Sequence, residues 1–379
     1  MTKNSYSNVN DNTPVLVGNS QLTDKRGIEG FNYLEILTEV SKKAIIDCES
    51  STKLDDHIDT VAVIRFVADT PHRDSATSNL WGYPNMPRSL SNSLNLSASN
   101  EIYTTTGGNS PQIALNELAN RIKDNQIDCA LLAGGEALDT FVGRLKDGLE
   151  VNWEDNPGGE PELIGKSVDG TNDHEKLHGL FDPSSVYPLF ANALRNEYGQ
   201  SIEEHMQDTG ELFENFSKVA SKNKYAWFPT HRSAEEIAEV KPENRMIGLP
   251  YTKYMNSIMR VNQSCAMVMM SAKKARNLGI PESKWIFMYS GSCINDIWNV
   301  SERINYHSSP AIKSCTDSVF ELANISIDQV DFIDLYSCFP SAVQVAMKEL
   351  SLNKDDQRGL TVTGGLPYFG GPGNAYVMN

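Results

Sequence analysis

The fold is decided by residues 101–133, which read EIYTTTGGNSPQIALNELANRIKDNQIDCALLA. This pattern predicts a strand over 101–106, a helix from about residue 109 to residue 123, and a second strand over 127–133. A strand, a helix and a strand joined by short turns form a right-handed crossover, and such crossovers build a mostly parallel sheet. The sequence therefore predicts an α/β protein.

The same alternation continues on both sides of this stretch. Upstream, the predicted strands and helix cover 14–17, 33–48 and 59–68. Downstream, alternating strands and helices are predicted over 264–271, 272–277, 285–290, 310–322, 330–335, 340–350 and 360–363. Two α/β halves are therefore expected, and the similar runs TTTGG (104–108) and TVTGG (361–365) are compatible with a duplication.

The two halves are separated by residues 136–249, which contain no clear buried strand. Residues 146–176 hold nine acidic and three basic side chains and are expected to form an exposed loop. Two helices are predicted after it, over 188–198 and 211–227. The expected parts of the chain are a disordered tail (1–13), an N-terminal half (14–135 with 250–278), an inserted helical loop domain (136–249) and a C-terminal half (279–379).

The charge balance of the 379 residues excludes some classes of partner. The chain has 33 Lys and Arg against 49 Asp and Glu, a formal net charge of −16, so no nucleic-acid partner is expected. No apolar run approaches the roughly 20 residues that span a bilayer. The polar start of the chain does not resemble a secretory signal, and the six cysteines form no Cys-x-x-Cys pair. These features favour free thiols in a reducing, cytoplasmic environment.

The most conspicuous short motif runs from His174 to His178 and has the pattern His-Glu-x-x-His. On a long helix, this spacing places two His on one face to bind zinc, with the Glu as general base. Here Gly170 precedes the motif, and Gly179 and Pro183 follow it closely, so only a short, solvated helix is expected. A zinc hydrolase is therefore the remote alternative, and no metal site is predicted.

The turn Gly107-Gly108-Asn109-Ser110 is the first candidate site, because it joins a strand to a helix. The glycines permit a sharp turn, and the helix start offers unpaired N–H groups and the positive end of a dipole. Such a turn can hold a nucleophile or an oxyanion. It can also serve only to cap the helix through Asn109, which on composition alone is the favoured interpretation, because helix caps far outnumber catalytic turns.

Two further junctions lie near the end of the chain. Cys338 follows a predicted strand at a helix start, where a thiol can have a lowered pKa, although a buried Cys usually serves packing. The glycine-rich segment 364–373 implies a close approach of the backbone to a ligand or to a neighbouring helix.

Four blocks in this order resemble the thiolase superfamily, most closely its sterol carrier protein-x branch and the related thiolase-like proteins. The blocks are residues 127–136, 262–266, 334–339 and 364–373. The resemblance covers nearly the whole chain. It implies a five-layered αβαβα duplicated fold with an inserted loop domain, and it leads us to expect a last core helix and two strands beyond residue 379.

The resemblance also implies where a thiolase would carry its reactive groups. The nucleophilic Cys falls at Gly108, the residue that binds the thioester oxyanion falls at Tyr336, and the activating His falls at Gly371. Ser110 and Cys338 are the nearby substitutes, so the candidate catalytic residues are Ser110, Tyr336 and Cys338. The candidate substrate-binding residues are Gly107, Gly108, Asn109, Tyr336, Gly364, Gly365 and Gly371.

The leading hypothesis is a thiolase-like protein of the acyltransferase class, similar to acetyl-CoA acetyltransferase of lipid metabolism, that binds coenzyme A thioesters through an altered site. Ordinary Cys-dependent thiolase activity is not expected, and neither is a covalently bound cofactor. The alternative is a non-catalytic lipid-binding, acyl-CoA-binding or scaffold subunit. A monomer, a homodimer and a partner-dependent complex all remain open.

Overall fold

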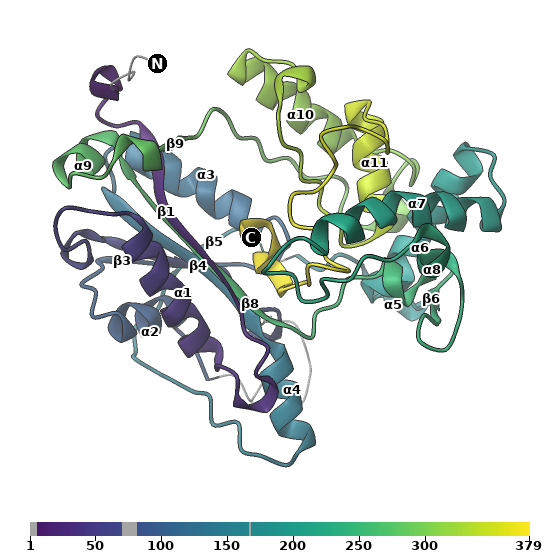
Figure 1. The fold of residues 1–379 in the computed structure, drawn as a ribbon, viewed down its shortest axis with the longest axis horizontal. Helices are drawn as coiled ribbons and strands as arrows, with labels where there is room; N and C mark the ends of the chain where they lie inside the picture. Colours follow the sequence, from purple (N-terminus) through teal and green to yellow (C-terminus); the bar gives the residue numbers. More distant parts are fainter. Residues whose placement is uncertain (1–5, 70–81, 167) are drawn as a thin grey trace. The chain divides into compact units, whose positions relative to one another are not determined.

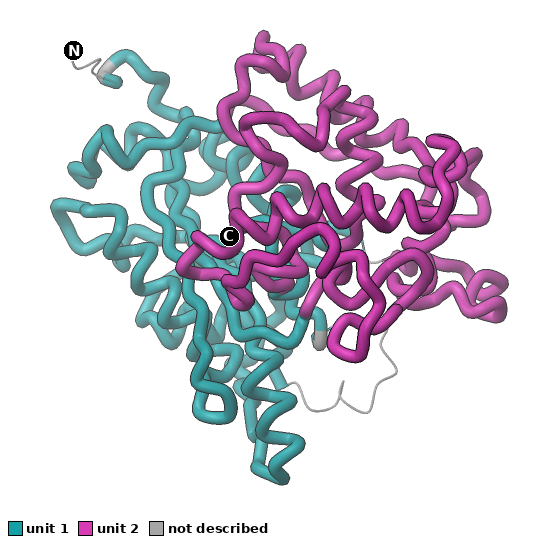
Figure 2. The backbone as a smooth tube through the Cα atoms, turned by 45° about the vertical axis from the view of Figure 1, so that its right-hand side comes forward, with its two compact units in different colours: residues 1–167, 259–288, 372–379 teal, residues 168–258, 289–371 magenta. Residues whose placement is uncertain are grey.

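The structure is a computed structural model that describes residues 6–69, 82–166 and 168–379. The chain forms two compact units (Figure 2), each built from separate segments of the sequence. Unit 1 consists of residues 1–167, 259–288 and 372–379, and unit 2 of residues 168–258 and 289–371.

Unit 1 is built on a seven-stranded sheet with the order β5-β3-β2-β4-β8-β1-β9 (Figure 1). Its strands are β1 (Pro14–Thr23), β2 (Thr60–Val63), β3 (Asn100–Thr104), β4 (Cys129–Ala137), β5 (Glu162–Ile164), β8 (Asn262–Ser271) and β9 (Ile286–Phe287). Strands β5, β3, β2 and β4 are mutually parallel, and β1 runs in the same direction, whereas β8 and β9 run against them. The mostly parallel sheet predicted from the crossover pattern is confirmed.

Helices cover both faces of this sheet. They are α1 (Tyr33–Asp47), α2 (Met86–Ser93), α3 (Ser110–Lys123), α4 (Leu138–Lys146) and α9 (Ala272–Asn277). Because side chains alternate along a strand, neighbouring residues of β4 enter different cores. Leu131 packs in the core that includes Val40 of α1, and Leu132 packs in the core that includes Leu118 of α3.

Unit 2 is largely helical. It contains α5 (Asp173–Leu177), α6 (Pro183–Glu197), α7 (Ile202–Ala220), α8 (Ala234–Ala238), α10 (Pro310–Ala323) and α11 (Pro340–Leu350), with the strand pair β6 (Met246–Gly248) and β7 (Tyr251–Thr252). Helix α7 begins with a capping box between Ser201 and Glu204 and buries Phe213 and Phe216. Its partners include α8, and α11 packs on α6.

The α/β class is confirmed, but two predicted strands are not formed. Residues 330–335 and 360–363 have no ladder partner within the described part of the chain. Leu335 N donates to Leu360 O at 3.0 Å, which is one bond rather than a ladder. The second large sheet of a five-layered arrangement is therefore not formed by the described residues.

Several expected boundaries differ from the structure. Helix α6 begins at Pro183, and Pro188, its expected start, lies inside it. The helix expected over 211–227 corresponds to α7, which covers Ile202–Ala220. Strand β5 pairs with β3, so the segment before residue 167 belongs to unit 1 rather than to the insertion. The expected tail includes a 3-10 helix at Tyr6–Asn8, and the Tyr6 ring stacks on Trp285 at 5.9 Å. Within the described ranges, every helix is too short or too polar to cross a membrane.

Candidate functional site

The Gly107–Ser110 turn lies in unit 1 between β3 and α3, and hydrogen bonds within that unit hold it. Ser110 is buried, and its hydroxyl donates to Thr105 O at 2.7 Å. Gly107 N donates to Asn374 Oδ1 at 3.1 Å. The prediction that the Asn109 side chain caps α3 is wrong, because that side chain makes no capping bond. The Ser110 hydroxyl proton is thus engaged by a carbonyl, which does not activate the oxygen as a nucleophile.

Gly371, the position where the resemblance places a catalytic His, is closely packed within unit 2. Its N–H donates to Ile258 O at 2.9 Å. A Cβ on Gly371 would lie 2.3 Å from Ser257 Oγ. A larger side chain at this position would therefore have to displace the Ser257 hydroxyl.

The glycine-rich segment approaches helix α7. A Cβ on Gly364 would lie 2.4 Å from the Ala220 Cβ, and one on Gly365 would lie 2.6 Å from Phe216 Cδ1. Both glycines also have positive φ values. The sequence left open whether these glycines approach a ligand or a neighbouring helix, and in the structure they approach helix α7.

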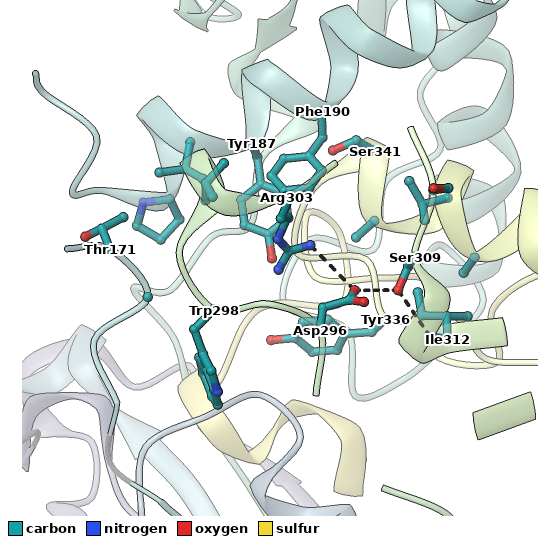
Figure 3. A pocket seen from close by; sticks show the side chains of 18 of the residues that line it. Thr171, Tyr187, Phe190, Asp296, Trp298, Arg303, Ser309, Ile312, Tyr336 and Ser341 are labelled. Carbon is teal, nitrogen blue, oxygen red and sulfur yellow. Dashed lines mark hydrogen bonds and ion pairs between the residues drawn. The ribbon is translucent and has the colours of Figure 1, made fainter. Parts of the chain in front are cut away.

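Tyr336 is the predicted site residue that lines a pocket. The pocket lies within unit 2, and its volume is about 560 Å³ (Figure 3). Helix α6, residues 296–303, the start of α10 and the first half of α11 form its walls. Its aromatic lining residues are Phe181, Tyr187, Phe190, Trp298 and Tyr336. A cavity of about 300–1,000 Å³ with apolar walls and a few polar groups is the usual form of a small-molecule site.

The polar part of the pocket is centred on Asp296. Its carboxylate accepts a 2.6 Å hydrogen bond from Ser309 Oγ and a 3.1 Å bond from Ala311 N. Arg303 Nη1 lies 3.5 Å from the same carboxylate. In Figure 3 the guanidinium lies between Asp296 and the rings of Tyr187 and Phe190.

Cys338 is half-buried beside this pocket wall and interacts with Tyr187, whose ring stacks on Phe339 at 4.3 Å. Burial raises the pKa of the Cys338 thiol to about 11, against the opposing effect of a hydrogen bond with Tyr187. Because the thiolate is the reactive form, this environment suppresses nucleophilic chemistry at neutral pH. The start of a helix, which can lower a thiol pKa, does not do so here.

The His174–His178 motif forms the short helix α5. The Glu175 carboxylate completes a capping box with Asn172 and also accepts from Ser301 N at 2.6 Å. His178 Nδ1 contacts His174 O at 2.9 Å. The described residues contain no group of three or more His, Cys, Asp or Glu side chains arranged to hold a metal ion. Glu175 therefore serves the local structure, and the zinc-hydrolase hypothesis has no support in this geometry.

Sequence reasoning missed the residues that surround Tyr336 in the pocket. Arg303, Asp296 and Trp298 lie in an irregular segment without a recognisable motif. Tyr187 and Phe190 are three residues apart on α6, a spacing that places both on one helical face. That signal could have been found, but starting the predicted helix at residue 188 left Tyr187 outside it.

Comparison with solved structures identifies the class of protein. The human mitochondrial 3-ketoacyl-CoA thiolase in complex with CoA matches with a TM-score of 0.59 and 14% identity, over 96% of this chain and 89% of that chain. An Ltp2-ChsH2(DUF35) aldolase matches with a TM-score of 0.65 and 16% identity, over 97% and 86%. These likenesses establish the thiolase fold.

A more similar structure defines the family. A monomeric SCP2-thiolase-like protein type 1 from Mycobacterium smegmatis is 33% identical, with a TM-score of 0.80, over 98% of this chain and 70% of that chain. The chain therefore belongs to the SCP2-thiolase-like proteins of the thiolase superfamily.

A curated relative agrees with this assignment. The acetyl-CoA acetyltransferase of Methanocaldococcus jannaschii is 26% identical over 188 residues, which are 50% of this chain and 45% of that enzyme. The matched stretch thus spans less than half of that enzyme. No family model matches the sequence.

We predict that Gly365→Ala destabilises the protein more than Gly359→Ala. Both glycines have φ of +77°, so Ala adds similar backbone strain, about 1–2 kcal/mol, at each. The Gly365 Cβ would meet Phe216, whereas the atom nearest to a Gly359 Cβ is Thr361 O at 3.8 Å. Overpacking adds roughly 1–3 kcal/mol at Gly365. Urea unfolding of both variants measures the difference, and equal losses would contradict the close packing on α7.

We also predict that Cys338 is alkylated slowly at pH 8 and faster as the pH rises toward 11. Because the Cys338 thiol has a pKa of about 11, it is mostly protonated at lower pH, and only about one molecule in 1,000 is thiolate at pH 8. Labelling with iodoacetamide followed by peptide mass spectrometry gives the rate, with the exposed Cys293 as internal reference. Labelling of Cys338 at pH 8 as fast as that of Cys293 would show that its environment is activating instead.

Proposed function

We propose that this chain binds a thioester of coenzyme A, with the acyl portion in the pocket of unit 2, and does not transfer acyl groups through a cysteine. The observation that carries the proposal is the position of Tyr336. The family resemblance places this residue where thiolases bind the thioester oxygen, and here it lines an aromatic pocket of about 560 Å³. A site that retains the binding space without the nucleophile is suited to binding rather than to covalent transfer.

The residues at the expected catalytic positions support the proposal that no acyl group is transferred through a cysteine. Gly108 has no side chain, and Gly371 packs against Ser257. The substitutes also lack activation, since the Ser110 hydroxyl donates to a carbonyl and the pKa of Cys338 is raised. Loss of a covalent nucleophile commonly removes most turnover and leaves the effects of binding.

The relatives support the choice of ligand. One is named as an acetyl-CoA acetyltransferase, and a solved structure of the same fold is a 3-ketoacyl-CoA thiolase in complex with CoA. On this basis we propose that the chain is related to the acyltransferases. We also propose that it has a role in lipid metabolism in the cytoplasm. The relatives do not indicate one oligomeric state for this chain. One is described as monomeric, whereas another structure is an Ltp2-ChsH2(DUF35) aldolase.

A second candidate function, a scaffold subunit, is favoured by exposed apolar side chains of unit 2. Helix α10 contributes no buried residue. Large apolar side chains nearby in the sequence are exposed, with Ile304 at 96%, Leu322 at 70% and Phe332 at 76%. Exposed apolar surface of this kind is typical of protein interfaces.

Calorimetry with acetyl-CoA and with CoA tests the leading proposal, with tryptophan fluorescence as a second readout. We expect saturable binding of acetyl-CoA and a change in fluorescence from Trp298, which lines the pocket. Trp298→Phe should remove most of that change, whereas the control Trp227→Phe, which does not line the pocket, should retain it. Absence of binding would contradict the proposal, and a signal unaffected by Trp298→Phe would place the ligand elsewhere.

A further inference from the structure

Arg303 is the cation among the residues that line the unit 2 pocket, and its hydrogen-bonding capacity is only partly used. A guanidinium has five N–H donors. Arg303 Nε donates to Ile297 O at 2.9 Å, and Nη1 makes the 3.5 Å ion-pair contact with Asp296. Within the described residues Nη2 has no hydrogen-bond partner. The side chain is therefore held in place through Nε and Nη1, and its Nη2 N–H groups are left for another oxygen.

The Asp296 carboxylate is held by two neutral donors as well as by its contact with Arg303. Ser309 Oγ and Ala311 N donate to it at 2.6 and 3.1 Å. Ser309 is the N-cap of the 14-residue helix α10 and Ala311 lies in its first turn, where the helix dipole also favours a negative charge. The carboxylate thus makes its shorter hydrogen bonds at the start of α10, and its 3.5 Å contact with Arg303 is the longest of the three.

The surroundings of Arg303 strengthen its interaction with an anion. Its side chain is 23% exposed, and its guanidinium carbon lies 5.4 Å from the centre of the Phe190 ring. Charge–charge attraction is stronger in such a partly dry, aromatic environment than in water. Arginine also binds carboxylates through two parallel N–H bonds, which gives geometric selectivity.

We infer that this pocket selects acyl groups that carry a carboxylate, which Arg303 binds through its Nη2 N–H groups while the aromatic walls hold the carbon chain. The inference rests on the proposed function, because it assigns the acyl class of the same coenzyme A thioester. The pocket provides an apolar body of about 560 Å³ and a single cation among its lining residues. A dicarboxylic acid esterified at one end to the thiol of coenzyme A matches both features. The net charge of −16 gives no general attraction for anions, so the selectivity has to come from this local group.

The test compares glutaryl-CoA with pentanoyl-CoA by calorimetry, since these thioesters have the same chain length and differ in the terminal carboxylate. We expect the wild-type protein to bind glutaryl-CoA at least tenfold more tightly. Arg303→Gln should remove that preference and change pentanoyl-CoA affinity less than threefold. Arg303→Lys keeps the charge but loses the paired donors, so it should retain part of the preference. This variant replaces Arg303→Gln in the test if the Gln variant does not fold.

Arg358→Gln is the matched control, because Arg358 also pairs with a nearby Asp, Asp356, but does not line this pocket. It should leave the preference unchanged. Equal affinities of the wild-type protein for the two thioesters would overturn the inference alone. An Arg303 variant that weakens both thioesters equally would also overturn it, since that result indicates a structural role. Failure of both thioesters to bind the wild-type protein would overturn the proposed function as well.

Discussion

The rest of the structure depends on the pairing of β4 with β8. These strands are antiparallel neighbours over nine residue pairs, from Cys129 opposite Met270 to Ala137 opposite Asn262. Residues 138–261, which connect these two strands, include residues 168–258 of unit 2. Because nearly every residue of both strands is buried, a shift of one position would reverse which core each side chain enters. The register is therefore firmly specified.

The positions that would carry thiolase chemistry are used here for packing and for local hydrogen bonds. Ser257 occupies the space beside Gly371, and helix α7 occupies the space beside Gly365. Outside the thiolase positions, Glu175, the general base of the zinc-hydrolase alternative, forms a capping box on its own short helix. Binding features are concentrated instead around Tyr336, where rings from α6 and the 296–303 segment enclose a cavity. Together these arrangements favour recognition of a ligand over covalent chemistry.

Much of the fold of unit 1 could be predicted from the sequence, because its elements carry strong local patterns. The helix predicted from residue 109 to residue 123 is α3 (Ser110–Lys123), and the β-branched run at 59–68 contains β2. The strands predicted at 330–335 and 360–363 have similar patterns but no partner strand among the described residues. A strand-like sequence indicates a preference for extended backbone, but a ladder forms only where a partner strand is available.

The candidate site was less predictable than the fold. Tyr336 could be placed by the family resemblance, but the side chains around it come from segments that are far apart in the sequence. Arg303 has no motif, and its significance arises from Asp296 and Phe190, whose proximity only the folded chain reveals. The raised pKa of Cys338 likewise depends on burial, which a helix-start pattern does not report.

The most direct test of the central claim is the intact mass of the protein after incubation with acetyl-CoA and rapid acid quenching. An ordinary thiolase accumulates an acetyl group on its cysteine, which adds about 42 Da, as expected for covalent catalysis. We predict an unchanged mass under conditions where calorimetry detects binding. A stable acetyl adduct mapped to Cys338 or Ser110 would contradict it and would show that the site has a working nucleophile.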